Sequence, residues 1–413
     1  MCRFKIKTFG CKLNQYESQL IIENLIKNNW SEVSSIQMAE YLVINSCAVT
    51  SNGVKELRKF VRSSHSKNPK LKIIVTGCVV EIYPDELKGL PLFNMISNKN
   101  KYEIPGIIFN QSSVCLDKIS SFNRHTRAFV KIQDGCNNKC SYCCAWMARG
   151  ESRSRKSGEI LEEIKILLNN DYKEIVLTGL CLGDFGKDIS SSLPQLLERI
   201  ENLSPDFRLR LSSIEPQDVS NDLISYIKKS KKIVPHLHIS LQSGSDKILS
   251  LMGRKYSKDY FRNIIYRLKN INNFQFSTDI ITGFPKENDD DFQNTLSLLK
   301  ELSPVRVHVF PFSPRPNTKA YGMGGSLSPS VINDRKRAAQ DLAKKVVVQN
   351  LQAQSGETFT VLFEGKNKDY WAGYTENYIR AVLKYKRNLK NTFRKVKVVN
   401  VNKDNLSVVV ETC

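Results

Sequence analysis

The amino-terminal part of the chain alternates short apolar runs with segments of helical spacing. Residues 4–9 alternate polar and apolar side chains, and residues 16–29 then repeat apolar side chains at helical intervals. Two further apolar runs, at residues 41–44 and 71–75, have the length of buried strands. This order predicts a parallel α/β domain, which we assign to residues 1–121.

The central part repeats a strand-then-helix pattern six times. We predict its strands at residues 128–133, 174–178, 208–212, 236–241, 276–281 and 305–310. Repeated units of this kind form a parallel sheet with right-handed crossovers. Because six units are fewer than a closed barrel of this type needs, we expect a partly open barrel over residues 122–350, which ends in a helix at residues 327–351.

The carboxyl-terminal part changes to short alternating strands. They are predicted at residues 358–363, 378–383, 393–401 and 406–411, and we interpret residues 351–413 as a small β-barrel. The predicted fold class is therefore α/β, with a parallel amino-terminal domain, a central partial barrel and a terminal β-barrel.

The amino-acid composition predicts a polyanionic partner and a reducing compartment. Lysine and arginine number 62 against 41 acidic residues, a formal charge of +21. Such an excess favours nucleic acid, although a lysine-rich proteome would also explain it. Eleven cysteines without a secretory leader, and no apolar run of membrane-spanning length, predict a cytoplasmic protein with no membrane partner.

Three cysteines, Cys136, Cys140 and Cys143, follow the first central strand and the turn at Asp134-Gly135. Three thiolates on one loop can hold three irons of a four-iron cluster and leave the fourth iron open to a ligand. A zinc knuckle or a set of reduced structural thiols is the alternative, but structural zinc sites usually add histidines or a second cysteine pair. We interpret the neighbouring Cys144 as pointing away from this site.

Three more cysteines, Cys11, Cys47 and Cys78, each follow a predicted strand of the amino-terminal domain. The carboxyl ends of parallel strands share one edge of a sheet, so these thiols are expected to converge into a second three-thiolate site. The alternative is three buried cysteines that cap strands. We interpret Cys115 as a core thiol.

The loop that carries Cys136, Cys140 and Cys143, called the cluster loop below, follows the first central strand. Polar and glycine residues follow the other central strands at the same edge of the predicted sheet. Each is alternatively a turn residue, but together they predict a polar cup over the loop. The candidates are Gly179, Ser212, Glu215, Gln242 and Asp279.

Two groups of basic and aromatic residues are candidates for binding RNA. Arginine side chains after the cluster loop can clamp phosphates, or can form a solvated charge run. Interleaved aromatic and basic residues of the terminal barrel can stack on bases, or can belong to a plain capping barrel. These candidates are Arg149, Arg153, Arg155, Tyr374, Tyr378 and Arg380.

The order of these parts resembles the methylthiotransferase branch of radical S-adenosylmethionine enzymes over essentially the whole chain. The matching segments include FGCKLNQYES at 9–18, VTGC at 75–78, VKIQDGCNNKCSYC at 130–143, LHISLQSGSDKILSLMGRKY at 237–256 and HVFPFSPRPNT at 308–318. GYTENYI at 373–379 resembles the RNA-binding barrel called TRAM.

The resemblance implies two [4Fe-4S] clusters, one held by the Cys136 trio and an auxiliary one held by the Cys11 trio. It also implies S-adenosylmethionine, which the polar cup would bind, so that cofactors rather than catalytic side chains carry the chemistry. The implied substrate is N6-threonylcarbamoyladenosine (t6A) just 3′ of the anticodon, in tRNAs that read codons beginning with A, and the implied reaction is methylthiolation at C2. An electron donor and a sulfur donor, both of unknown identity, are further implied partners.

Two alternatives remain at this point. The opening GCKLNQYES and the GRKY segment at 253–256 are most similar to the t6A enzymes, but the sibling enzyme that acts on isopentenyladenosine (i6A) shares most of the other motifs. A non-catalytic iron-sulfur or zinc protein that binds RNA is the alternative from another class.

Overall fold

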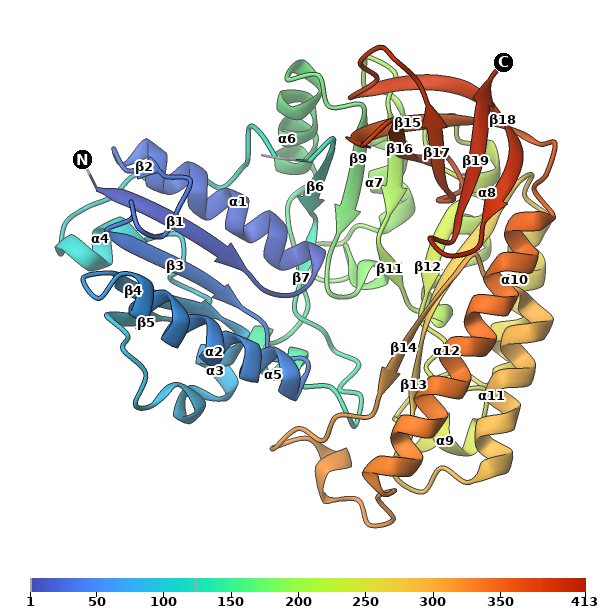
Figure 1. The fold of residues 1–413 in the computed structure, drawn as a ribbon, viewed down its shortest axis with the longest axis horizontal. Helices are drawn as coiled ribbons and strands as arrows, with labels where there is room; N and C mark the ends of the chain where they lie inside the picture. The colour runs from blue at the N-terminus through green and yellow to red at the C-terminus, as the bar shows by residue number, and fades with distance from the viewer. Residues whose placement is uncertain (1, 123–124) are drawn as a thin grey trace.

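The computed structural model describes residues 2–122 and 125–413, and it begins with a five-stranded parallel sheet (Figure 1). The strand order is β2-β1-β3-β4-β5. The strands are β1 (Arg3–Thr8), β2 (Ser31–Glu32), β3 (Tyr41–Ser46), β4 (Lys72–Gly77) and β5 (Asn94–Ile96). The helices are α1 (Lys12–Lys27), α2 (Ser51–Lys67), α3 (Cys78–Ile82) and α4 (Ile104–Phe109).

Apolar side chains cover both faces of this sheet. Leu42 and Ile44 of β3 pack with one buried cluster, which also holds Leu57 of α2, and Val43 packs with another, which holds Leu25 of α1. Successive residues of a strand point to opposite faces, so a strand covered on both faces reads as an apolar run. This explains why residues 41–44 do not alternate.

The central part is a parallel sheet that curves into a partial barrel. Two hydrogen-bonded sets, β6-β9-β10 and β11-β12-β13-β14, are joined through the bridge between Leu209 and Ile233. The strands are β6 (Arg127–Lys131), β9 (Glu174–Thr178), β10 (Arg208–Leu211), β11 (Ser213–Ile214), β12 (His236–Ile239), β13 (Gln275–Thr282) and β14 (Arg306–Pro311). The predicted set of parallel central strands is confirmed, with β6 and β14 as the two edges.

Helices cover the outside of the partial barrel, and smaller elements surround the cluster loop (Figure 1). The outer helices are α6 (Ser157–Asn169), α7 (Leu193–Glu201), α8 (Asn221–Lys229), α9 (Asp246–Leu251), α10 (Lys258–Lys269), α11 (Asp289–Leu302) and α12 (Pro329–Gln352). The smaller elements are α5 (Ala145–Arg149), β7 (Gln133–Asp134) and β8 (Arg153–Ser154). Short 3-10 turns lie at Pro84–Leu87, Leu182–Asp184, Pro216–Asp218 and Lys319–Gly322.

The carboxyl-terminal part is a closed barrel with the strand order β15-β16-β17-β19-β18. Its strands are β15 (Thr358–Asn367), β16 (Tyr370–Thr375), β17 (Arg380–Lys384), β18 (Thr392–Asn402) and β19 (Ser407–Thr412). The predicted small β-barrel is confirmed, but the sequence prediction missed β16. That strand contains Gly373, whose missing side chain lets β16 approach β15: an added Cβ would lie 2.1 Å from the Leu362 carbonyl oxygen.

The terminal barrel packs against the amino ends of the central strands, opposite the cluster loop (Figure 1). Arg127 at the start of β6 pairs with Glu364 at 2.5 Å, and Arg210 of β10 donates to the Thr375 carbonyl oxygen at 3.4 Å. The terminal barrel therefore closes one end of the partial barrel. Among the described residues, no helix combines the length and the apolar character that crossing a bilayer requires.

Candidate iron-sulfur centres and substrate cavity

Backbone hydrogen bonds fix the start of the cluster loop to the segment that follows it in the chain. Gln133 and Asp134 of β7 pair with Ser154 and Arg153 of β8, and the Cys136 N–H donates to the Gly150 carbonyl oxygen at 3.1 Å. Gly135 has φ +75° and packs so closely that an added Cβ would lie 1.9 Å from the Glu151 carbonyl oxygen. The turn predicted at Asp134-Gly135 therefore requires glycine, and it fixes where the loop begins.

Hydrogen-bond donors surround the three sulfur atoms of this loop. The Asn138 N–H lies 3.5 Å from Cys136 Sγ, the Ala145 N–H lies 3.4 Å from Cys143 Sγ, and Arg254 donates to Cys140 Sγ at 3.2 Å. Such donors stabilise thiolates and tune an iron-sulfur cluster. Arg254 belongs to the GRKY segment at 253–256 and also pairs with Glu215, so it connects the loop with the predicted polar cup.

The three thiols have different acidities. A hydrogen bond from the Cys181 thiol lowers the pKa of Cys136 to about 7, whereas burial raises the pKa of Cys143 to about 12. Cysteine binds metals as the thiolate, so cluster binding would release protons here.

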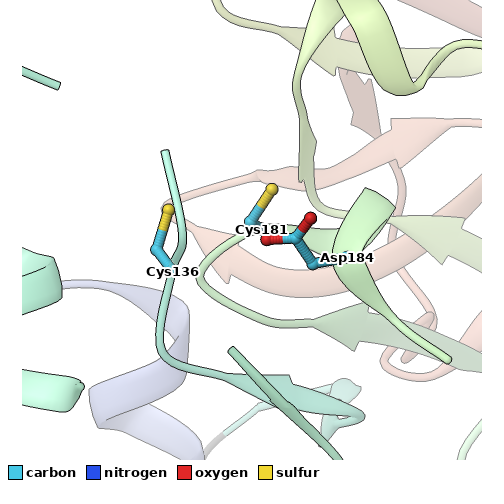
Figure 2. Close-up of side chains that lie close together, drawn as sticks. All are labelled: Cys136, Cys181 and Asp184. Atoms are coloured by element: carbon cyan, nitrogen blue, oxygen red, sulfur yellow. The ribbon is translucent and has the colours of Figure 1, made fainter. Parts of the chain in front are cut away.

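Cys181 and Asp184 lie beside Cys136, as Figure 2 shows. The possible ligand atoms of these three side chains lie within 4.8 Å of one another. The sequence prediction counted Asp184 only among the polar residues that follow this strand and gave Cys181 no role in the site, although both follow β9 at the same edge as the cluster loop. The rule that strand ends converge at one edge was the signal that would have found them.

The second cysteine trio gathers at the carboxyl edge of the amino-terminal sheet. Cys11, Cys47 and Cys78 follow β1, β3 and β4, and the Cys47 thiol interacts electrostatically with both other thiols. Gly10 leaves room for this approach, because an added Cβ would lie 3.0 Å from Cys47 Sγ. Burial raises the pKa of Cys47 to about 12.

The structure also brings two other groups of possible metal ligands close together. Among the described residues, the groups of three or more whose ligand atoms lie within 4.8 Å of one another are Cys136/Cys181/Asp184 and His238/Asp279/His308. Neither predicted trio is drawn together that tightly.

Two further cysteines, Cys144 and Cys115, lie outside both trios. Cys144 points away from the cluster trio, as predicted, and its Sγ lies 3.3 Å from the Ala48 carbonyl oxygen of the amino-terminal domain. The interpretation of Cys115 as a core thiol is wrong, because this side chain is exposed. It lies in a segment without regular secondary structure, and its Sγ is 3.7 Å from the Tyr102 carbonyl oxygen at the surface.

A cavity of about 230 Å³ lies between the two cysteine regions. Val49 and Thr50 line it from the amino-terminal domain, and Cys143, Gln242 and Asp279 line it from the central barrel. Two of the five predicted cup residues, Gln242 and Asp279, thus face the same space as a cluster cysteine. Of the six cysteines of the two trios, Cys143 lines this cavity.

The other cup residues lie at the same carboxyl edge. Ser212 is buried and its hydroxyl has no hydrogen-bond partner among the described residues, and the same holds for one carboxylate oxygen of Asp184. Buried polar atoms are rarely left unpaired, so these two atoms fit a polar ligand such as S-adenosylmethionine. Gly179 packs on Gln133, whose Oε1 would lie 2.8 Å from an added Cβ.

Arg149, Arg153 and Arg155 line one cavity of about 730 Å³ between the amino-terminal and central domains. The structure corrects the RNA-binding prediction for Arg149, because its buried guanidinium pairs with Glu17 at 2.8 Å and with Asp134 at 3.0 Å. Arg155 likewise pairs with a carboxylate. Among the described residues, only Arg153 of these three has no carboxylate partner and is exposed.

The structure also corrects the prediction for Tyr378. Its ring packs against Tyr374 with a centroid distance of 4.8 Å and against His236 with one of 4.6 Å, inside the closed end of the partial barrel. It therefore serves the interface between the two barrels rather than an RNA surface. Tyr374 is half-buried in the same interface, whereas Arg380 is exposed.

Comparisons with known proteins agree with this geometry. The model of the radical SAM superfamily matches residues 130–299, and that of the uncharacterized protein family UPF0004 matches residues 3–96. A solved structure of the radical S-adenosylmethionine methyltransferase TsrM from Kitasatospora setae is similar with a TM-score of 0.59 at 10% identity, and the match covers 78% of this chain and 75% of that one. The fold and the cluster loop define a radical S-adenosylmethionine enzyme, which uses a [4Fe-4S] cluster and S-adenosylmethionine.

Two relatives narrow the assignment. The threonylcarbamoyladenosine tRNA methylthiotransferase MtaB of Thermotoga maritima is 39% identical over 91% of this chain and 90% of its own length. A tRNA-2-methylthio-N(6)-dimethylallyladenosine synthase of Thermodesulfovibrio yellowstonii is 34% identical over 91% and 90%. The chain belongs to the tRNA methylthiotransferase family of radical S-adenosylmethionine enzymes.

Proposed function

We propose that this enzyme converts t6A next to the anticodon of tRNA into its 2-methylthio derivative. The observation that carries the proposal is the cavity of about 230 Å³, which brings residues beside two separate cysteine trios to one space. A radical enzyme with one cluster can activate a C–H bond, but methylthiolation also needs a place for sulfur. The second trio, Cys11, Cys47 and Cys78, is our candidate for the ligands of that auxiliary cluster.

The t6A substrate is supported by similarity. The relative named for threonylcarbamoyladenosine is 39% identical, against 34% for the relative named for dimethylallyladenosine. The same comparison keeps i6A as the second candidate substrate.

The cluster and S-adenosylmethionine together supply a radical strong enough to remove hydrogen from adenine C2, which no side-chain base can deprotonate. Cys136, Cys140 and Cys143 would hold that cluster. Gly179, Ser212, Glu215, Gln242 and Asp279 would hold S-adenosylmethionine at the carboxyl edge of the strands. Glu215 would act together with Arg254, which also hydrogen bonds to Cys140.

For the RNA we propose contacts from exposed basic residues on both sides of the molecule. Arg153 is exposed and lines the cavity between the domains, and Arg380 is exposed on the terminal barrel. We further propose tRNAs that read codons beginning with A as substrates, a cytoplasmic location, and separate electron and sulfur donors.

The proposal is tested by reacting the reconstituted enzyme with anticodon stem-loops that carry either t6A or i6A. Mass spectrometry of the digested nucleosides should show the methylthio derivative of t6A. Formation of only the methylthio derivative of i6A would assign the enzyme to the sibling activity. Formation of neither product, with no cleavage of S-adenosylmethionine, would support a binding protein instead.

A further inference from the structure

His238 of β12, Asp279 of β13 and His308 of β14 come from three neighbouring strands of the partial barrel. Their apolar neighbours along the strands belong to, or pack against, the core beneath the outer helices: Leu237, Ile239, Ile280, Val307 and Val309. Successive residues of a strand point to opposite faces of a sheet, so the three polar side chains point into the interior of the barrel. The strand register places Asp279 directly beside His308.

The three side chains form a compact set of nitrogen and oxygen atoms. His238 Nε2 lies 3.0 Å from Asp279 Oδ2, and one atom of each of the three side chains lies within 4.8 Å of the other two. Ligand atoms that bind one zinc ion at about 2.0–2.2 Å lie about 3–4 Å from one another. Small rotations bring the set to that spacing, and His308 is free to make them because it is exposed on an edge strand.

A fourth residue, Ser277, holds one of the histidines in the orientation that a metal ligand needs. The Ser277 hydroxyl lies 2.9 Å from His238 Nδ1, so Nε2 is the ring nitrogen that faces Asp279. Histidine ligands of metal sites usually donate their second ring N–H to an oxygen atom in this way, which fixes the tautomer and the ring. Ser277 is itself buried, and its hydroxyl also lies 3.1 Å from His236 Nε2. The His238 ring is therefore oriented before any ion binds.

Two cavities give access to this set of side chains. His308 lines a cavity of about 630 Å³ beside the terminal barrel, and Asp279 lines the cavity of about 230 Å³ that also contains Cys143. An ion bound here would keep open coordination positions toward these cavities. Arg306, two residues before His308 on the same strand, adds a positive charge at the first cavity, which favours an anionic oxygen group as a further ligand.

The ligand types determine which ions fit. Two imidazoles and a carboxylate, without a thiolate, suit divalent ions of the first transition row such as Fe²⁺, Zn²⁺ or Mn²⁺. Two histidines and one carboxylate with open positions are also the set that binds a single Fe²⁺ ion in many enzymes. Soft ions such as Cu⁺ prefer the sulfur ligands that this set lacks.

We propose that His238, Asp279 and His308 bind one divalent ion of the first transition row inside the partial barrel, at a site separate from both cysteine trios. Oδ2 of Asp279 is the ligand atom, which leaves Oδ1 for the S-adenosylmethionine contact proposed above. The inference goes beyond the proposed function and does not depend on which adenosine is the substrate.

The test compares the metal content of the reconstituted protein with that of His308→Ala. After dialysis against Zn²⁺, elemental analysis should show about one more zinc per chain in the unchanged protein, because the variant lacks one of the three ligands. His308 is exposed on an edge strand, so the iron content and the circular dichroism spectrum should be the same in both proteins. His125→Ala removes an exposed histidine outside this group and is the matched control, which should bind as much zinc as the unchanged protein.

A second probe, Mn²⁺, separates this site from zinc bound to free cysteines, because Mn²⁺ prefers oxygen ligands to thiolates. Titration followed by the electron paramagnetic resonance signal of the free ion should show binding that depends on His308. Ser277→Ala keeps all three ligands but removes the partner that orients His238, so it should weaken Mn²⁺ binding about ten- to a hundredfold.

The outcomes separate this inference from the proposed function. If neither Zn²⁺ nor Mn²⁺ binds in a way that depends on His308, the three side chains form only a hydrogen-bonded group and the inference is wrong. Metal binding is measured without RNA, so failure of the enzyme to modify t6A stem-loops would overturn the proposed function and leave the metal site standing.

Discussion

At the scale of single residues, the most informative contact is the buried carboxylate of Glu17. It pairs with Arg149 at 2.8 Å and with Lys101 at 2.6 Å, and all three side chains are almost fully buried. Burial alone would raise the pKa of Glu17, but these cations and Lys131 hold it well below its ordinary value. Because Glu17 belongs to α1 and Arg149 to the cluster loop region, this ion-pair group joins the amino-terminal domain to the central barrel.

We predict that Glu17→Gln lowers the free energy of unfolding by about 3–5 kcal/mol, because buried cations lose their counterion. The folded-state pKa is lowered, so the difference between the two proteins should be complete above about pH 5 and should shrink as the pH falls further. Urea denaturation across this pH range measures both effects. Asp85→Asn, which breaks the exposed pair with Lys88, is the control and should leave the free energy of unfolding nearly unchanged.

At the scale of elements, the turn from β4 into α3 places Cys78. Gly77 has φ +97°, and an added Cβ would lie 2.4 Å from the Ser46 carbonyl oxygen at the end of β3. A side chain here would push apart the two strand ends that carry Cys47 and Cys78. The spacing of the second trio therefore depends on a glycine that is not itself a ligand.

We predict that the reconstituted protein holds about eight irons per chain and that Gly77→Ala holds about four, because only the auxiliary cluster should be lost. Iron analysis and the spectrum of the remaining cluster measure this. Gly158→Ala, where nothing lies within 4 Å of an added Cβ, should retain all the iron. A content of about four irons in the unchanged protein would contradict the auxiliary cluster.

Elements with a long, regular pattern were predictable from the sequence, and short or irregular ones were not. Parallel strands such as β9 were found because both of their faces are buried and they appear as apolar runs. The strands β2 and β5 contain two and three residues, too few to establish a period. The prediction placed a strand at 378–383, but Tyr378 has φ +69° and belongs to the turn before β17.

The candidate site was predictable only in part, for a related reason. The cysteines could be placed because each follows a strand, and the ends of parallel strands converge. The pairing of Glu17 with Lys101 and Arg149 links positions far apart in the chain, and no local pattern marks such partners. For the same reason the sequence alone predicts an RNA contact for Arg149, whose carboxylate partners lie elsewhere in the chain.

At the scale of the whole molecule, the excess positive charge should make RNA binding strongly dependent on salt. Each arginine that contacts a phosphate adds about one to the slope of log affinity against log salt concentration. We predict that Arg153→Ala and Arg380→Ala each reduce this slope by about one, because both side chains are exposed and are the arginines that we propose to contact phosphates. Binding titrations with t6A stem-loops at several salt concentrations measure the slope for each variant.

A matched variant distinguishes this effect from a loss of structure. Arg149→Ala should weaken folding and leave the salt slope unchanged, because its guanidinium is already bound by carboxylates within the protein. An unchanged slope in both Arg153→Ala and Arg380→Ala would show that the RNA lies on a different surface.

The two cysteine trios lie in different domains, and this arrangement has a mechanical consequence. Neither domain alone sets the distance between the Cys136 trio, where the reaction would start, and the Cys11 trio, where it would be completed. That gap is set by the docking of the domains, and the Glu17 ion-pair group is part of the joint. If the two domains docked less firmly, S-adenosylmethionine could still be cleaved at the Cys136 trio, but the substrate would no longer be held close to the Cys11 trio. S-adenosylmethionine would then be consumed without forming product.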